Sequence, residues 1–226
     1  MPNKTKVLPF VLLAVVLVLS IVFFIQSQDP VANEVLVQEE NVENTEGASL
    51  VADTEYMIDV DNSFVQWKGE KKLVNSNHVG NISVKSGLFE VAAGQLVAGE
   101  VVMDMTSMTL AEGDNGGEKL LGHLEAEDFF DVENHPEASL VFDRVEERDG
   151  NVYGVGELTI KGITEPVEFS VAAVGLDDND LVTVIGNMEF DRSLFDVRYG
   201  SESFFEGLGD NVIKDVVEIQ FVIVGK

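Results

Sequence analysis

The stretch NVYGVGELTIKGITEPVEFSVAAV, from Asn151 to Val174, is the clearest local pattern in the chain and decides its fold class. On its first arm Leu158 and Ile160 share one face, and on its second arm every other residue from Val167 to Val171 does the same. Such alternation with a period of two is typical of a strand that buries one face. Gly162 lies between the arms and suits a turn, so the stretch predicts a β-hairpin.

The glycines and the proline of this hairpin indicate what kind of sheet it joins. Gly154 and Gly156 disfavour a helix and suit a strongly bent strand, as at the corner of a barrel. Pro166 lacks a backbone N–H, so it fits near the start of a strand but not in a fully paired position. The hairpin therefore predicts a curved antiparallel sheet.

Short apolar alternations elsewhere predict further strands, which are connected mostly by short turns. We expect about eight strands in all, with a second hairpin through Gly94 and one helical interruption at Asp114–Phe130. The other predicted strands are Val79–Val91, Gln95–Thr106, Ala138–Val145, Leu181–Phe190 and Val212–Val224, together with Tyr56–Val60 and Phe64–Trp67, which are either two strands or one bent strand. Eight antiparallel strands can close into a barrel with one or two short helical insertions, but the pattern alone is equally compatible with a sandwich.

Composition limits the classes of function. The 226 residues carry 41 acidic and 14 basic side chains, a formal net charge of -27, which repels nucleic acid phosphates. The chain has no cysteine, so it contains no disulfide and no thiol nucleophile. No calcium loop with the D-x-D-x-D-G pattern is present, and we predict neither a metal nor a cofactor.

The first 52 residues are predicted to be an attachment to one folded domain, which we expect at residues 53–226. Lys4 and Lys6 precede an uncharged apolar run, Val7–Ile25, which is long enough as a helix to cross the hydrocarbon layer. Residues 1–25 are therefore a signal anchor or a cleaved signal peptide, and both place the domain outside the cytoplasm, in the periplasm or beyond. Residues 26–52 are acidic and poor in apolar residues, which predicts a disordered tether.

Candidate catalytic residues do not form a recognisable motif. His78, His123 and His135 lie on separate segments without a nucleophile signature, and spacing gives no support for a metal site. The acidic cluster of Glu125, Glu127, Asp128 and Asp131 offers a carboxylate pair of the kind that cleaves glycosides, but such clustering is expected by chance in a chain with 41 acidic residues.

A set of apolar side chains gives the stronger functional hypothesis. Each of them alone is best explained as core, but methionines beside many aromatic rings could together line a channel for a flexible apolar ligand. The predicted cavity wall comprises Trp67, Phe89, Met103, Met105, Phe129, Phe142, Phe169, Phe190 and Phe221. Candidates for gripping a ligand head group are His78, Arg192 and Arg198, although pairing of the arginines with nearby carboxylates is an equal alternative.

Motifs along residues 53–226 resemble the YceI-like family. They are YMID at Tyr56–Asp59, HVG at His78–Gly80, GLF at Gly87–Phe89, DFFD at Asp128–Asp131, GELTIKGIT at Gly156–Thr164 and FDR at Phe190–Arg192. Their common order and spacing carry the resemblance. The chain departs from the family pattern at Asn62, Leu140 and Asp196, where the family often has His, Phe and Gly.

The resemblance implies an extracytoplasmic, lipocalin-like barrel associated with polyisoprenoid lipids. We therefore expect non-catalytic binding, sequestration or transport of a long apolar lipid, of polyisoprenoid or isoprenoid-quinone type, in an open apolar tunnel. Two alternatives stay open: a membrane-tethered surface or stress-response domain acting through protein contacts, and a hydrolase using the acidic or histidine residues. The expected partners are an isoprenoid-type lipid, the membrane through the N-terminal helix, and a second copy in a possible homodimer.

Overall fold

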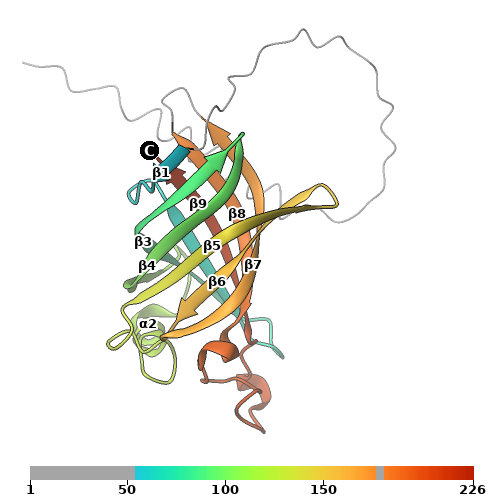
Figure 1. Cartoon of the computed structure of the whole chain (residues 1–226). Helices are drawn as coiled ribbons and strands as arrows, with labels where there is room; N and C mark the ends of the chain where they lie inside the picture. Colours follow the sequence, from blue (N-terminus) through green and yellow to red (C-terminus); the bar gives the residue numbers. More distant parts are fainter. Residues whose placement is uncertain (1–53, 177–180) are drawn as a thin grey trace, which may run out of the picture. The chain divides into compact units, whose positions relative to one another are not determined.

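Strand pairing decides between the two architectures that the sequence left open. The structure, a computed structural model, describes residues 54–176 and 181–226. Its strands are β1 (Thr54–Met57), β2 (Phe64–Glu70), β3 (Asn77–Ala92), β4 (Gln95–Leu110), β5 (Glu137–Arg148), β6 (Asn151–Ile160), β7 (Ile163–Leu176), β8 (Val182–Asp191) and β9 (Val216–Gly225). Hydrogen bonding follows the order β1-β3-β2-β9-β8-β7-β6-β5-β4, and β4 pairs back onto β3 (Figure 1). Strands β2 to β9 therefore close into an antiparallel barrel, and β1 extends the pairing of β3 near its end.

Two-residue turns connect the central strands and set their register. Lys161 and Gly162 have φ angles of 53° and 71° between the paired residues Ile160 and Ile163, as a type I′ turn requires. The same pair of positive φ angles occurs at Ala93-Gly94 and at Asp149-Gly150. The predicted hairpins at residues 151–174 and 79–106 are thus confirmed, and the I′ twist matches the strong twist of a barrel.

The long strands carry β-bulges, which change the face that a residue presents. Register shifts interrupt the β3–β4 pairing at three places, the β5–β6 pairing between Phe142 and Arg144, and the β7–β8 pairing between Val171 and Ala173. A bulge adds one residue to one strand and increases the local bend. These positions allow strands of up to 16 residues to wrap around the interior.

The predicted helical interruption is shorter than expected. The helix α2 spans Gly117–Leu124, eight residues, and not the whole of Asp114–Phe130. Beyond Leu124 the chain follows a series of turns, in which Phe130 N donates to Leu124 O and Asp131 adopts a φ of 50°. The helical spacing of apolar residues therefore predicted the structure correctly only as far as Leu124. Phe129 and Phe130 continue that spacing, but they lie in turns and pack in or against the core from there.

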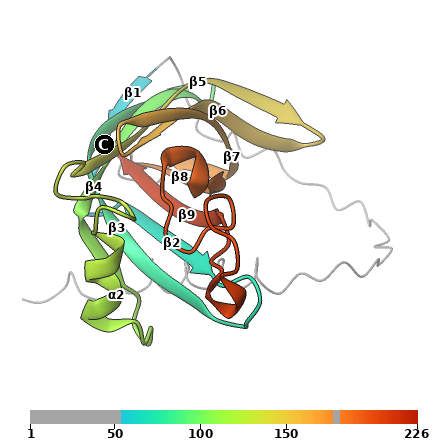
Figure 2. The same ribbon diagram turned by 90° about the horizontal axis from the view of Figure 1, so that it is seen from below.

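The helix α2 and the connection from β8 to β9 lie at the same end of the barrel, which is the lower end in Figure 1. The connection from β8 to β9 contains two 3-10 turns, η1 (Arg192–Phe195) and η2 (Gly209–Asn211). Figure 2, which looks at this end, shows η1 across the barrel opening and α2 outside the ring of strands. Phe195 of η1 is 1% exposed and packs edge-on against Phe190. The η1 turn therefore closes this end with an apolar side chain.

The predicted anchor at residues 1–25 and tether at residues 26–52 lie outside the described residues. Within residues 54–176 and 181–226, none of the helices has the length and apolar character that a membrane crossing requires.

Candidate functional site

The barrel interior contains two apolar cavities that meet near its middle. The upper cavity, of about 70 Å³, lies toward the β3–β4 turn, and its wall includes Phe89, Leu96, Val101 and Val184. The lower cavity, of about 120 Å³, lies toward α2 and η1, and its wall includes Leu124, Phe129 and Phe190. Both walls contain Val65, Met103, Met188 and Ile219. The expected open tunnel is thus divided into two compartments by side chains from four strands.

Aromatic rings occupy much of the interior because glycines on neighbouring strands make room for them. The rings of Trp67, Phe142, Phe169 and Phe221 stand directly opposite Gly80, Gly99, Gly154 and Gly186. A Cβ atom added at Gly154 would lie 2.0 Å from Phe169 Cζ, and one at Gly186 would lie 2.4 Å from Phe221 Cζ. Gly154, which was predicted to suit a bent strand, therefore also admits the ring of Phe169.

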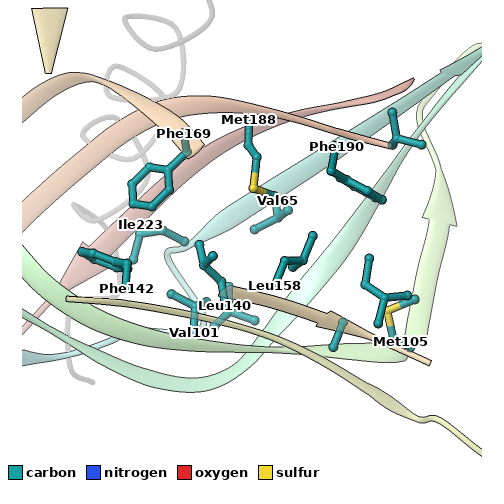
Figure 3. Packing of buried hydrophobic residues seen from close by; sticks show 14 of the residues in the cluster. Val65, Val101, Met105, Leu140, Phe142, Leu158, Phe169, Met188, Phe190 and Ile223 are labelled. Carbon is teal, nitrogen blue, oxygen red and sulfur yellow. The ribbon is translucent and has the colours of Figure 1, made fainter. Parts of the chain in front are cut away.

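The rings in the upper half support one another. Phe169 contacts Phe142 edge-on with ring centroids 5.0 Å apart, and Phe221 edge-on at 5.9 Å. Figure 3 shows Phe142, Phe169 and Ile223 at one end of the cluster and Met105 and Phe190 toward the other, with Met188 between. Edge-to-face packing of this kind adds roughly 0.5–1.5 kcal/mol per pair beyond the burial of area. These rings form a rigid wall.

The boundary between the cavities is more adaptable. Met188 is 8% exposed, lies in the middle of β8 and points toward Val65 of β2 (Figure 3). Met103 of β4 also belongs to both cavity walls. An unbranched methionine has three rotatable side-chain bonds and fills irregular space at low cost. Met103 and Met188 are therefore the side chains of this boundary best able to change rotamer.

All the residues predicted from sequence as a cavity wall line one of these cavities. Phe89, Phe142, Phe169 and Phe221 face the upper cavity, Met103 faces both, and the lower cavity is lined by Trp67, Met105, Phe129 and Phe190. Contact of these residues with a ligand stays a prediction. Sequence reasoning missed three apolar partners that lie two positions from a predicted residue, namely Val65, Met188 and Ile219. Period-two alternation was the signal that could have found them.

The structure places Arg192 in the wall of the lower cavity and near the carboxylate of Asp215, the alternative left open by the sequence, while contact with a ligand head group stays a prediction. Its side chain is 1% exposed, and its N–H groups donate to the backbone carbonyls of Lys214, Val197, Tyr199 and Ile213 at 3.1, 3.1, 2.9 and 3.3 Å. Its Nη2 also lies 3.3 Å from Asp215 Oδ1, at ion-pair distance but outside hydrogen-bond geometry. Burial lowers the pKa of Arg192 from its ordinary value, opposed by the charges of Asp215 and Asp191. The guanidinium therefore ties the β8–β9 connection together.

The other two head-group candidates lie apart from Arg192 and outside both cavity walls. His78 Nδ1 is 2.9 Å from Asp114 Oδ1, and this carboxylate also accepts from Val79 N and Gly116 N. Burial raises the pKa of Asp114, but these hydrogen bonds outweigh it and lower the pKa below its ordinary value. Arg198 is exposed, and its Nε donates to Asp196 Oδ1 at 2.6 Å. The structure does not bring the three candidates together.

The residues considered for catalysis lie outside the interior. His123 is 3.8 Å from Asp128, and His135 is 3.9 Å from Asp131. None of these side chains belongs to the wall of either interior cavity. Among the residues that the structure describes, no group of three or more His, Asp or Glu side chains has a geometry suited to a metal ion.

The three departures from the family pattern have local explanations. Asn62 donates to Asp59 Oδ2 at 3.0 Å and is the main cause of a pKa below the ordinary value at Asp59. Leu140 is 9% exposed and lines the upper cavity. Asp196 has a φ of 58°, in the left-handed region that glycine adopts most readily. None of the three disturbs the barrel.

Comparison with known proteins agrees with this architecture. A family model described as the YceI-like domain matches residues 56–225. The structure is similar to that of Burkholderia cenocepacia BcnA, with a TM-score of 0.53 and 22% identity, covering 75% of this chain and 99% of that one. It is also similar to a polyisoprenoid binding domain from Saccharophagus degradans implicated in plant cell wall breakdown, with a TM-score of 0.51 and 15% identity, covering 76% and 97%. None of the curated proteins searched matches the chain.

Proposed function

Because the chain belongs to the YceI-like family, we propose that its barrel binds a long apolar lipid of polyisoprenoid type in the interior, without chemical conversion. The observation that carries the proposal is the pair of adjoining apolar cavities, whose common wall contains two methionines. The fold shared with a solved polyisoprenoid binding domain supports the same class of ligand. The specific lipid, a location outside the cytoplasm, the membrane anchor and a homodimer are further parts of the proposal; the location and anchor rest on the N-terminal sequence.

The energetics are those of the hydrophobic effect applied to a ligand. Burial of several hundred Å² of isoprenoid chain contributes roughly 10 kcal/mol at about 25 cal/mol per Å², before the cost of association. The lower cavity, of about 120 Å³, is slightly smaller than the engineered cavities of about 150 Å³ that bind one benzene molecule. A longer chain therefore needs both cavities and further space, which rearrangement of interior side chains, Met103 and Met188 among them, has to open.

Uptake of a radiolabelled isoprenoid alcohol by the purified, delipidated full chain tests the proposal. We expect saturable binding, which Met188→Phe weakens about tenfold or more because a ring at this position keeps the cavities apart. Met57→Phe is the matched control, since Met57 is 55% exposed on β1 and belongs to neither cavity wall. Absence of saturable uptake by the unaltered chain would disprove lipid binding, and equal weakening by both substitutions would disprove the assigned location.

A further inference from the structure

Exposed apolar side chains gather at the end of the barrel where α2 and η1 lie. Among the residues that the structure describes, eleven large hydrophobic side chains are exposed. Six of them belong to the β2–β3 loop or to the β8–β9 connection, namely Leu73, Val74, Leu194, Tyr199, Phe204 and Phe205. Figure 1 shows this connection projecting beyond the ends of the strands. Single exposed apolar residues are ordinary, but a group of them on projecting segments at one end is typical of an interaction site.

A compact turn keeps two of these side chains, Phe204 and Phe205, exposed. Their backbone N–H groups both donate to Ser201 O, at 3.3 and 3.1 Å. Ser203 N donates to Ser201 Oγ at 3.1 Å, and Ser203 Oγ donates to Asp215 Oδ2 at 2.8 Å. Ser201 is buried, whereas the two rings are 39% and 48% exposed. The exposure of the rings is therefore built into a hydrogen-bonded part of the fold.

The β2–β3 loop lies beside this turn and carries a second apolar group, Leu73 and Val74. Lys72 N donates to Val212 O at 3.0 Å, and the Lys72 ammonium pairs with the carboxylate of Glu202. Figure 2 shows the loop and the connection side by side at this end. The two apolar groups and the lysines before Leu73 thus belong to one surface, called here the end patch: Lys71, Lys72, Leu73, Val74, Phe204 and Phe205.

The charges of the end patch differ from those of the chain as a whole. The formal net charge is -27, but residues 68–77 contain three lysines and one glutamate. Glu202 and Glu206 flank the two rings, and Lys72 pairs with the first of them. Arg198 adds a further cation 5.2 Å from the centre of the Phe204 ring. More distant acidic groups are largely screened beyond about 10 Å at ordinary ionic strength, so a phosphate group is not repelled here.

A phospholipid bilayer suits this combination better than a protein surface. A stable protein contact needs roughly 800 Å² of closely packed surface on each partner, whereas these side chains stand on two separate turns. The interface of a bilayer accepts single aromatic and aliphatic side chains among its head groups. Lysines beside such side chains are attracted to the lipid phosphates, and the exposed pair of Lys72 with Glu202 is weak enough to exchange for one.

From these observations we infer that the end patch docks on the surface of a phospholipid bilayer. Phe204, Phe205 and Leu73 lie among the head groups, and Lys71 and Lys72 contact phosphates. Glu206 keeps the rings at a shallow depth, because a carboxylate stays in water. This inference goes beyond the proposed function and does not depend on whether the barrel interior holds a lipid.

Spin labels on the full chain test the inference. Because the chain has no cysteine, one introduced cysteine carries a nitroxide at a chosen place. The protein is mixed with vesicles of phosphatidylcholine and phosphatidylglycerol, and collisions of the label with oxygen and with a water-soluble nickel complex report its surroundings. Labels at Leu73→Cys and Phe205→Cys should gain oxygen collisions and lose nickel collisions. The matched control is Val141→Cys, which is 47% exposed on β5 and should stay in water.

The reading is local, so attachment of another segment to the vesicle does not imitate docking. The double change Phe204→Ser and Phe205→Ser, read from the label at Leu73→Cys, should lower the ratio of docked to undocked molecules about tenfold or more, because two exposed rings are lost. Circular dichroism checks that this variant folds, and the labels on the otherwise unaltered chain decide if it does not.

Three outcomes overturn the inference. Equal nickel collisions at positions 73, 205 and 141 would show that the end patch stays in water, as expected if it binds another protein. Protection of the label at 141 together with the others would show unspecific adsorption. Unchanged protection at 73 after loss of both rings would show that Phe204 and Phe205 do not hold the protein at the bilayer. None of these results affects uptake of a radiolabelled isoprenoid alcohol, which tests the proposed function separately.

Discussion

The glycines opposite the interior rings should tolerate no side chain, and Gly154 gives the sharpest test. In Gly154→Ala the new Cβ atom would lie 2.0 Å from Cζ and 2.5 Å from both Cε atoms of Phe169. Ordinary contact needs about 1.5 Å more, but Phe169 is 2% exposed and held by Phe142 and Phe221. Overpacking of this kind costs about 1–3 kcal/mol. We expect the upper half of that range, because the ring cannot withdraw without moving two others.

Urea unfolding followed by circular dichroism measures the effect as a change in the free energy of unfolding. Gly175→Ala is the matched control, since Gly175 lies in β7 and an added Cβ there meets nothing within 4 Å. The control should be neutral or stabilise by up to about 1 kcal/mol, because alanine is favoured over glycine in a strand. The double variant Gly154→Ala with Phe169→Leu should be less destabilised than the sum of its single changes. Equal stability of the two alanine variants would refute the pairing of rings and glycines.

Further predictions concern the connection between β8 and β9 and the pH dependence of stability. Arg192→Met should cost about 3–5 kcal/mol in urea unfolding, because it leaves four carbonyls without their donor; Arg198→Met, at an exposed pair, should change stability by less than about 0.5 kcal/mol. Hydrogen bonds from Lys214 and, second in effect, from Lys68 lower the pKa of Glu70 from 4.5 to about 2. The stability that these bonds add is therefore complete above pH 4.5 and is lost as the pH falls through about 2. Glu70→Gln should remove about 1 kcal/mol at pH 6 and clearly less at pH 2, where the carboxylate is partly protonated, measured by urea midpoints; an equal loss at both pH values would contradict this assignment. Asp196→Gly should be neutral or stabilising in thermal unfolding while Asp196→Ala costs about 1 kcal/mol, because the φ of 58° suits glycine; the reverse order would exclude backbone strain as the cause.

The hairpins could be predicted from sequence because their determinants are local. Alternation from Glu157 to Val171 and the glycine at position 162 are enough to define two arms and a type I′ turn. Closure of the sheet could not be derived in this way, because the pairing of β3 with β4 and of β2 with β9 joins residues far apart in the chain. The choice between a barrel and a sandwich therefore had to come from family resemblance or coordinates.

The residues of the candidate site likewise fall into those that a local sequence pattern predicts and those that depend on distant contacts. Inward-facing aromatic residues were predictable, since large apolar residues at alternate positions of a closed sheet face its interior. The role of Arg192 was not, because its partners at residues 197–214 belong to a connection without periodic pattern. The length of α2 was overestimated because the apolar stripe continues through turns that bury Phe129 and Phe130. At Arg192 and at the end of α2, tertiary contacts that leave no local sequence pattern determine the structure.

The interior combines tightly confined side chains with flexible ones, and under the proposed function this contrast determines how a lipid would enter. Phe142 and Phe169 are each confined by a glycine opposite and by a neighbouring ring, so their rotation would require the sheet to open. Val65 and Ile219 at the boundary are β-branched and have few rotamers. Adjustment is left to Met103 and Met188, the two flexible side chains that line both cavities. A ligand should therefore change the methyl resonances of these two methionines while the aromatic rings keep their positions, and a ligand-bound structure with displaced phenylalanines would show that the rings, not the methionines, open the path.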